Sequence, residues 1–374
     1  MTTPNPLLQL NQNGQSVWLD NLSRRLLRSG QLRRLVEQDG ITGITSNPAI
    51  FAAAISGGDD YDEQIRSLAD GDLDTIGLYE TLAIDDIRSA ADLLRPVFDR
   101  CDRGDGFVSL EVNPHLARDS DGTLEEAERL WKAVDRPNLM VKIPGTAEGV
   151  PAIEEALYRG VNINVTLLFS LKDYAAVMQA HLRAMERRRD DGLPLAGVAS
   201  VASFFLSRID TQVDERLDEI AGTQPSAGSL RGQAAVASAK AAYRLWQETY
   251  TGPRWEALHA AGAQVQRPLW ASTSTKDPSY PDTKYVEPLV GKQTVNTMPD
   301  ATIDAFRDHG KVVADSVEDG VAEALEVPPK LAALGIDLDQ VTAALVVEGI
   351  AKFEKPFDAL LQNLEEKRAA LAAA

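Results

Sequence analysis

The sequence predicts an α/β fold, a (β/α)8 barrel of the TIM type that carries extra helical insertions and a C-terminal helix. Two observations lead to this expectation. Short apolar runs rich in β-forming residues alternate with longer segments of helical spacing along all 374 residues, a rhythm typical of βα units. Polar residues collect at the ends of the apolar runs, as they do at the active-site rim of a parallel barrel.

Eight runs have the length and composition of buried strands. In chain order they are residues 17–20, 41–46, 107–112, 139–143, 163–169, 198–204, 268–272 and 294–298. Between them, apolar residues at helical spacing are clearest in residues 22–38, 123–134, 171–189 and 301–308. Because neighbouring parallel strands are joined by crossover helices, eight such strands predict a closed barrel wrapped by helices.

Two connections are longer than a single crossover helix. Residues from about 51 to about 103 should form two or three helices, broken near Gly57-Gly58 and at Gly71, and residues from about 207 to about 263 two more, broken at the GTQPSAGS stretch. We interpret both as insertions within a single domain that spans residues 1–374. The tail from about 338 to 374 also has helical spacing and should pack along the outside of the barrel.

The composition excludes several classes of partner. Hydrophobic residues make up 44% of the chain and charged residues 25%, as in ordinary globular proteins. The net charge of −18 repels phosphate backbones and anionic lipids, which argues against nucleic acid and membrane partners. A single cysteine, Cys101, leaves no internal disulfide, CxxC zinc pair or iron-sulfur cluster. With no apolar leader segment, we expect a cytoplasmic protein, and its oligomeric state stays open.

Every predicted strand contributes polar residues, and they collect towards the strand ends. In chain order they are Asp20, Thr45, Ser46, Asn47, Glu111, Asn113, Lys142, Asn164, Thr166, Ser203, Ser272, Ser274 and Asn296. The carboxyl ends of the strands in a parallel barrel meet at one rim, so these side chains should surround one site. Capping of the following helices is the alternative for Ser46, Ser170 and Asn113. Capping does not explain Lys142 or Glu111.

Lys142 lies in the apolar stretch NLMVKIPGT, so its amine should be poorly solvated. Burial disfavours the charged form of a lysine. A neutral amine can attack a carbonyl carbon, and the resulting Schiff base withdraws electrons from the neighbouring carbon–carbon bond. A structural ion pair with Glu111 and an amine that reaches solvent at the barrel mouth are the alternatives, and sequence position alone does not decide among the three.

Carboxylates are the candidates for proton transfer. The chain has four scattered histidines, His115, His181, His259 and His309, with no pair at metal-ligand spacing. We therefore expect packing or surface roles for them and predict no metal site. Asp20 and Glu111 are the carboxylates at strand ends, which makes them the candidate acid and base.

A phosphate group would need positive charge at the same rim. Arg208 lies just past the sixth predicted strand, and Lys276 lies in the loop after the seventh. Barrels often bind phosphate in this sector. The loop over residues 273–288 contains three prolines and two tyrosines, so it should be stiff and is a candidate lid.

Taken with these residues, the chain resembles the transaldolase family from about residue 16 to about residue 306. The segments that carry the resemblance are GITSNPAIF, VSLEVNPHLARD, NLMVKIPGTAEGVPAI, GVNINVTLLFS, ASFFLSRID and ASTSTKDPSYPDTKYVEPLVGKQTVNTMP, and the last is similar to the longer bacterial branch. The resemblance implies a (β/α)8 barrel that needs neither metal nor organic cofactor. It also implies transfer of a dihydroxyacetone unit from sedoheptulose 7-phosphate to glyceraldehyde 3-phosphate, giving erythrose 4-phosphate and fructose 6-phosphate in the pentose phosphate pathway.

The resemblance also implies roles for matching residues. The family's Schiff-base lysine falls on Lys142, the carboxylate that opens the carbon–carbon bond on Asp20, and the carboxylate that acts through a water on Glu111. Further matches are Asn47 and Asn164 at the donor hydroxyls, Thr166 at the water, and Ser203 and Arg208 at phosphate, with Thr45 and Phe205 also assigned to substrate binding. A second phosphate arginine of the family has no counterpart, and Ser272, Ser274 and Lys276 stand in its sector.

Three alternative functions stay open. A fructose 6-phosphate aldolase would release the three-carbon unit, but the related aldolases carry Gln where this chain has Glu111 and Tyr where it has Phe205, so both positions favour transfer. A metal-dependent barrel enzyme would need histidines at ligand spacing. A non-catalytic barrel that binds sugar phosphates should have lost the lysine or a carboxylate, and this chain retains both.

Overall fold

The eight predicted strands form a closed parallel barrel. The computed structural model describes residues 5–68 and 71–372, and within them the strands pair in the order β1 to β8, with β8 returning to β1. Their bounds are β1 (Gln15–Leu19), β2 (Ile41–Ile44), β3 (Val108–Glu111), β4 (Leu139–Pro144), β5 (Ile163–Leu168), β6 (Ser200–Phe205), β7 (Gln266–Ala271) and β8 (Thr294–Met298). The predicted (β/α)8 barrel is confirmed.

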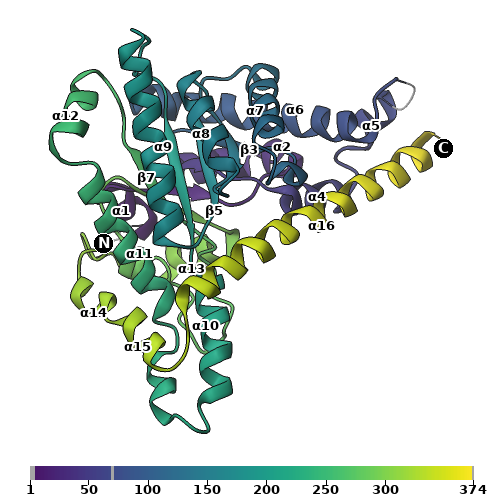
Figure 1. Ribbon diagram of the computed structural model, residues 1–374. Coiled ribbons are helices and arrows are strands. Elements are labelled where there is room, and N and C mark those ends of the chain that lie inside the picture. Colours follow the sequence, from purple (N-terminus) through teal and green to yellow (C-terminus); the bar gives the residue numbers. More distant parts are fainter. Residues whose placement is uncertain (1–4, 69–70, 373–374) are drawn as a thin grey trace.

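Helices surround the barrel (Figure 1). They are α1 (Pro6–Gln12), α2 (Arg24–Arg28), α3 (Gln31–Gln38), α4 (Pro48–Ser56), α5 (Asp62–Leu68), α6 (Thr75–Arg100), α7 (Ser120–Val134), α8 (Gly149–Tyr158), α9 (Leu171–Asp190), α10 (Ser207–Ile220), α11 (Ala234–Thr249), α12 (Gly252–Ala260), α13 (Asp300–His309), α14 (Val321–Leu325), α15 (Val327–Ala333) and α16 (Leu338–Ala372). Short 3-10 turns lie at η1 (Pro114–Leu116), η2 (Pro225–Leu230) and η3 (Glu287–Leu289).

Two helical segments differ from the expectation. The single helix expected over residues 22–38 is two helices, α2 and α3, because Gly30 between them adopts a left-handed backbone with a φ of 74°. The connection after β6 holds three α-helices in place of two, because α12 begins as a separate helix at Gly252 with Pro253 in its first turn. The connection after β2 holds α4, α5 and α6, as expected.

The register of the strands aligns the polar residues predicted for the site. Glu111 on β3 is the Cα partner of Lys142 on β4, and Lys142 is the partner of Asn164 on β5. Partnered residues in neighbouring strands point to the same face of a sheet, so these three side chains project together into the barrel. The β5–β6 pairing shifts register between Val165 and Leu168, and a bulge of this kind re-aims neighbouring side chains.

The amino-terminal end of the barrel is filled by a polar network. Arg267 donates to Ser16 Oγ at 2.6 Å and to the Thr294 carbonyl at 2.7 Å, and Asp105 accepts from Trp18 Nε1 at 2.9 Å. Every one of these side chains is largely buried. Such an arrangement at the amino end of a barrel contributes to stability, while the carboxyl end is left for chemistry.

The C-terminal helix crosses the mouth of the barrel, and the expectation that it packs along the outside is wrong. Figure 1 shows α16 as one long helix that runs from beside α10 to beside α4, and it packs against α4, α10 and β5. Because α4 and α10 follow the carboxyl ends of β2 and β6, this path lies over the carboxyl rim. Among the residues described, no helix has the length and apolarity needed to cross a membrane.

Candidate active site

A cavity of about 250 Å³ opens at the carboxyl end of the barrel. Ten of the twelve predicted site residues line it, namely Asp20, Thr45, Asn47, Lys142, Thr166, Ser203, Phe205, Arg208, Ser272 and Lys276. The remaining two, Glu111 and Asn164, lie beside the lining residues, against Lys142 and Ser203 respectively. The structure therefore brings together residues that are far apart in the chain.

Lys142 is enclosed at the wall of this cavity. Its side chain is only 6% exposed, and its Nζ donates a hydrogen bond to the Ser46 carbonyl at 3.2 Å. The Glu111 Oε2 atom lies 3.6 Å from Nζ, close enough for an ion pair and too long for a strong hydrogen bond. The amine is thus both paired with a carboxylate and directed at the cavity, so it does not extend to solvent as one alternative required.

Glu111 is buried and has few partners. Neither of its carboxylate oxygens has a hydrogen-bond partner among the described residues. Burial raises the pKa of Glu111 to about 7, with the positive charge of Lys142 opposing the rise and the charge of Asp20 adding to it. A carboxyl group with a pKa near neutrality can both give and take a proton at physiological pH.

Asp20 lies directly after β1 and lines the same cavity. Its Oδ1 atom accepts a hydrogen bond from Thr45 Oγ1 at 2.7 Å, and Thr45 Oγ1 lies 2.7 Å from Thr297 Oγ1. Thr45 and Thr297 come from β2's carboxyl end and from β8. Two neighbouring strands therefore fix the orientation of this carboxylate.

A second set of hydrogen bonds orients Asn164. Its Nδ2 donates to Ser109 Oγ at 3.0 Å, and its Oδ1 accepts from Ser203 Oγ at 2.7 Å. Two positions further along β5, the Thr166 hydroxyl is fully buried and has no hydrogen-bond partner among the described residues. The next residue, Leu167, has a φ of 59°, a left-handed conformation that costs energy in a branched residue and is often retained at functional sites.

Asn47, and not Ser46, caps the helix after β2. Asn47 Oδ1 accepts from the Ile50 amide at 3.0 Å at the start of α4, whereas Ser46 Oγ donates to the Ser109 carbonyl at 2.7 Å. The capping interpretation of Ser46 is wrong. Because α4 begins at Pro48, the capping position directly before the helix is Asn47 and not Ser46. The capping interpretation is confirmed for Ser170 and Asn113, which cap α9 and η1.

Positive charge gathers on one side of the cavity. Arg208, in the first turn of α10, is largely buried, and its guanidinium lies 5.4 Å from the centre of the Phe205 ring. One of its terminal nitrogens is buried without a hydrogen-bond partner among the described residues. Lys276 Nζ donates to Ser274 Oγ at 2.7 Å, and burial together with the charge of Arg208 lowers the pKa of Lys276. The two positive charges repel each other, and an anion bound between them would stabilise both.

The loop over residues 273–288 is tied to α10. Tyr280 donates to Asp214 at 2.7 Å and Tyr285 donates to Asp210 at 2.9 Å, and Lys284 lies 3.6 Å from Asp210. Because α10 also carries Arg208, these contacts fix the loop with Lys276 relative to that arginine.

Comparison with known proteins identifies a family that matches almost the whole chain. The model of the transaldolase/fructose-6-phosphate aldolase family matches residues 17–364. The chain belongs to this family. Proteins named transaldolase from Saccharopolyspora erythraea and Thermobifida fusca are 50% and 48% identical to it, and each alignment covers 98% of this chain and 99% of the relative. A protein named transaldolase 2 from a Nostoc species is 46% identical over 97% of both chains. The family and the transferase class expected from the sequence are confirmed.

The sequence did not predict that a residue of the C-terminal helix would line the active-site cavity. Phe353 of α16 lines the cavity, and the centre of its ring lies 5.4 Å from Lys142 Nζ. Thr297 of β8 and Thr273 also line the cavity. Strand position could have indicated the two threonines, but no local pattern in the tail distinguishes Phe353 from the other apolar residues of an amphipathic helix.

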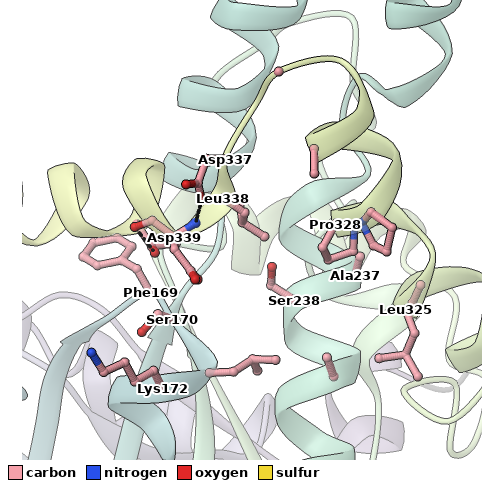
Figure 2. Close-up of a pocket in the computed structure, with 17 residues that line it drawn as sticks. Phe169, Ser170, Lys172, Ala237, Ser238, Leu325, Pro328, Asp337, Leu338 and Asp339 are labelled. Carbon is pink, nitrogen blue, oxygen red and sulfur yellow. Dashed lines mark hydrogen bonds between the residues drawn. The ribbon is translucent and has the colours of Figure 1, made fainter.

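A larger cavity of about 660 Å³ lies away from these residues (Figure 2). It is bounded by α9, α11, α14, α15 and the start of α16, and side chains such as Ala237, Leu325 and Pro328 make its lining mainly apolar. None of the predicted site residues lines it. Among the described residues, no three His, Cys, Asp or Glu side chains are grouped so that they could hold a metal ion.

Proposed function

We propose that the chain transfers a dihydroxyacetone unit between sugar phosphates through a Schiff base on Lys142, with sedoheptulose 7-phosphate as donor and glyceraldehyde 3-phosphate as acceptor. The observation that carries the proposal is the buried amine of Lys142, which faces a cavity lined by Asp20 and approached by Glu111. Full-length relatives named transaldolase support the same activity.

Glu111 donates and accepts the protons that are transferred during Schiff-base formation. The Lys142 amine attacks the ketose carbonyl and gives a carbinolamine, whose hydroxyl must receive a proton before it leaves as water. A Glu111 carboxyl with a pKa of about 7 can supply that proton and recover it in the reverse step. A water held by the unpartnered Thr166 hydroxyl would connect the carboxyl to the reacting carbon.

Asp20 opens the carbon–carbon bond. Its carboxylate removes the proton from the hydroxyl on C4 of the donor, and the C3–C4 bond breaks as the C4 oxygen becomes an aldehyde. The electron pair of that bond moves to the iminium nitrogen on Lys142, which leaves a neutral enamine. The reverse sequence joins the enamine to the acceptor aldehyde, with Asp20 returning the proton to the new hydroxyl.

The remaining residues hold the sugar. We assign the phosphate to Arg208, Ser272 and Lys276, because the two cations lie on one side of the cavity and Arg208 has an unpartnered nitrogen. Asn47 and Asn164 are assigned to the donor hydroxyls. The Ser203 hydroxyl already donates its proton to Asn164, so we assign it to the positioning of that amide and not to phosphate.

The charge of the site and of the whole chain indicates the class of substrate. A cavity with clustered cations inside a chain of net charge −18 suits small anionic metabolites and not large polyanions. We propose that these metabolites are sugar phosphates and that the protein acts in the cytoplasm.

Borohydride reduction in the presence of fructose 6-phosphate tests the proposal. Mass spectrometry should find one reduced dihydroxyacetone unit on Lys142 of the full chain, and Lys142→Ala should carry none. Near-normal turnover by Lys142→Ala would refute the mechanism. Stoichiometric release of free dihydroxyacetone by the native protein without an acceptor would instead favour the aldolase activity that shares the family description.

A further inference from the structure

Phe353 is the residue of the C-terminal helix that enters the active-site cavity. It is only 7% exposed and lines the cavity together with residues from the barrel strands. Its ring centre lies 5.4 Å from Lys142 Nζ. An aromatic face at this distance stabilises a cation such as an ammonium or an iminium, and it also occupies space that water would otherwise fill.

The path of α16 brings this ring to the amine. Gly349, one turn before Phe353, lies so close to β5 that an added Cβ would come within 2.9 Å of Leu167 Cδ2 and 3.7 Å of an Arg208 nitrogen. An added methyl group there would force either the Leu167 side chain or the helix to shift. Gly349 therefore allows the close approach that places Phe353 in the cavity.

The far end of α16 is fixed as well. Lys367 donates to the Gly58 carbonyl at 2.7 Å and pairs with Asp62 at 2.6 Å, and Arg368 donates to the Leu73 carbonyl at 2.8 Å. These contacts tie the helix to the insertion after β2. Contacts that lie before and after Phe353 along α16 therefore hold its ring over the mouth of the barrel.

We propose that Phe353 is a specificity-determining residue that keeps solvent water, other than the water assigned to Thr166, from the Lys142-bound enamine and so directs the enamine to the acceptor aldehyde. The proposal rests on the Schiff-base function assigned above. The enamine has two fates. Its nucleophilic carbon can attack the acceptor carbonyl, whose oxygen takes the proton held by Asp20, and water then hydrolyses the new iminium to the transfer product and the lysine amine. The enamine can also take a proton from water to form an iminium, which a second water hydrolyses to free dihydroxyacetone and the lysine amine.

The proposal predicts a change in the ratio of release to transfer. Two rates are measured on the full chain: release of dihydroxyacetone from fructose 6-phosphate without acceptor, and formation of sedoheptulose 7-phosphate with erythrose 4-phosphate. Phe353→Ala should raise the ratio by about tenfold or more, equivalent to about 1.4 kcal/mol of lost discrimination. Phe353→Leu restores part of the apolar bulk and should raise it by a smaller factor, which keeps the test available if the alanine variant does not fold.

Leu360→Ala is the matched control, because Leu360 is fully buried on the same helix and does not line the cavity. It should lower the melting temperature without changing the ratio. An equal rise in this control would attribute the release to loosening of α16 and overturn the inference, as would an unchanged ratio in both Phe353 variants. Borohydride labelling of Lys142 separates the two levels: no label in the native protein would overturn the Schiff-base function itself, whereas normal labelling with an unchanged ratio would overturn only the role of Phe353.

Discussion

Replacing Glu111 with Gln isolates the proton transfer that accompanies Schiff-base formation. The substitution keeps the size of the side chain but replaces a carboxyl group that can give and take a proton with an amide that cannot. Burial raises the pKa of Glu111 from 4.5 to about 7, so the protonated fraction falls from about 90% at pH 6 to about 10% at pH 8. A dehydration step that needs the protonated carboxyl should therefore slow by about tenfold across this interval.

The assay is the pre-steady-state rate of borohydride-trappable complex formation with fructose 6-phosphate. Both proteins carry Lys142, so the informative quantity is the ratio of the native rate to the Glu111→Gln rate at each pH. We expect the ratio to be about 10² or more at pH 6, in the range typical of general acid catalysis, and to fall as the pH rises through 7. A ratio that is flat between pH 6 and pH 8, or that rises with pH, would refute the assignment of Glu111 as the acid in this step.

Three further predictions address other parts of the molecule. Asp20→Ala should still give the borohydride-trapped adduct on the lysine but should form no cleaved product, and loss of trapping would contradict its assignment to bond cleavage. Arg208→Ala should raise KM about 10- to 150-fold for phosphorylated sugars, since a charge-assisted contact of about 1.5–3 kcal/mol is removed. Steady-state kinetics with an unphosphorylated sugar should show little change in KM. Equal effects on both sugars would exclude a phosphate contact. Gly43→Ala should lower the free energy of unfolding by about 1–3 kcal/mol in denaturant titrations, because the added methyl would lie 2.4 Å from the Trp18 ring, whereas Gly228→Ala, with open space around it, should change it by less than about 0.5 kcal/mol.

The barrel was predictable from the sequence because its strands are buried on both faces. Such strands read as short apolar runs, and the runs at residues 139–143 and 294–298 match β4 and β8 almost residue for residue. Two of the differences arise where a strand begins with a polar residue. β1 begins at Gln15 and β7 at Gln266, and both glutamines are buried at the amino end of the barrel, where Gln15 donates to the Leu289 carbonyl and Gln266 to Ser200 Oγ. A local pattern does not show that a distant partner will satisfy a polar side chain.

The candidate site was predictable to the extent that it follows from strand ends. Parallel strands place their carboxyl ends on one rim, so a list of polar residues at those ends already assembled Asp20, Glu111 and Lys142. Individual roles were less accessible. Ser46 and Asn47 are neighbours with equal capping tendency, and only the point at which α4 begins decided which of them caps the helix.

By itself the sequence determined the fold class, the family and the set of polar residues at the barrel rim, because each depends on local pattern or on motifs within one segment. Tertiary structure alone decided the electrostatics and the roof of the site. The pKa of Glu111 depends on how deeply the assembled barrel buries that carboxyl beside Lys142. The position of Phe353 depends on a helix that crosses the barrel mouth, where Gly349 approaches β5 closely. This contact joins segments almost two hundred residues apart, and no pattern within either segment encodes it.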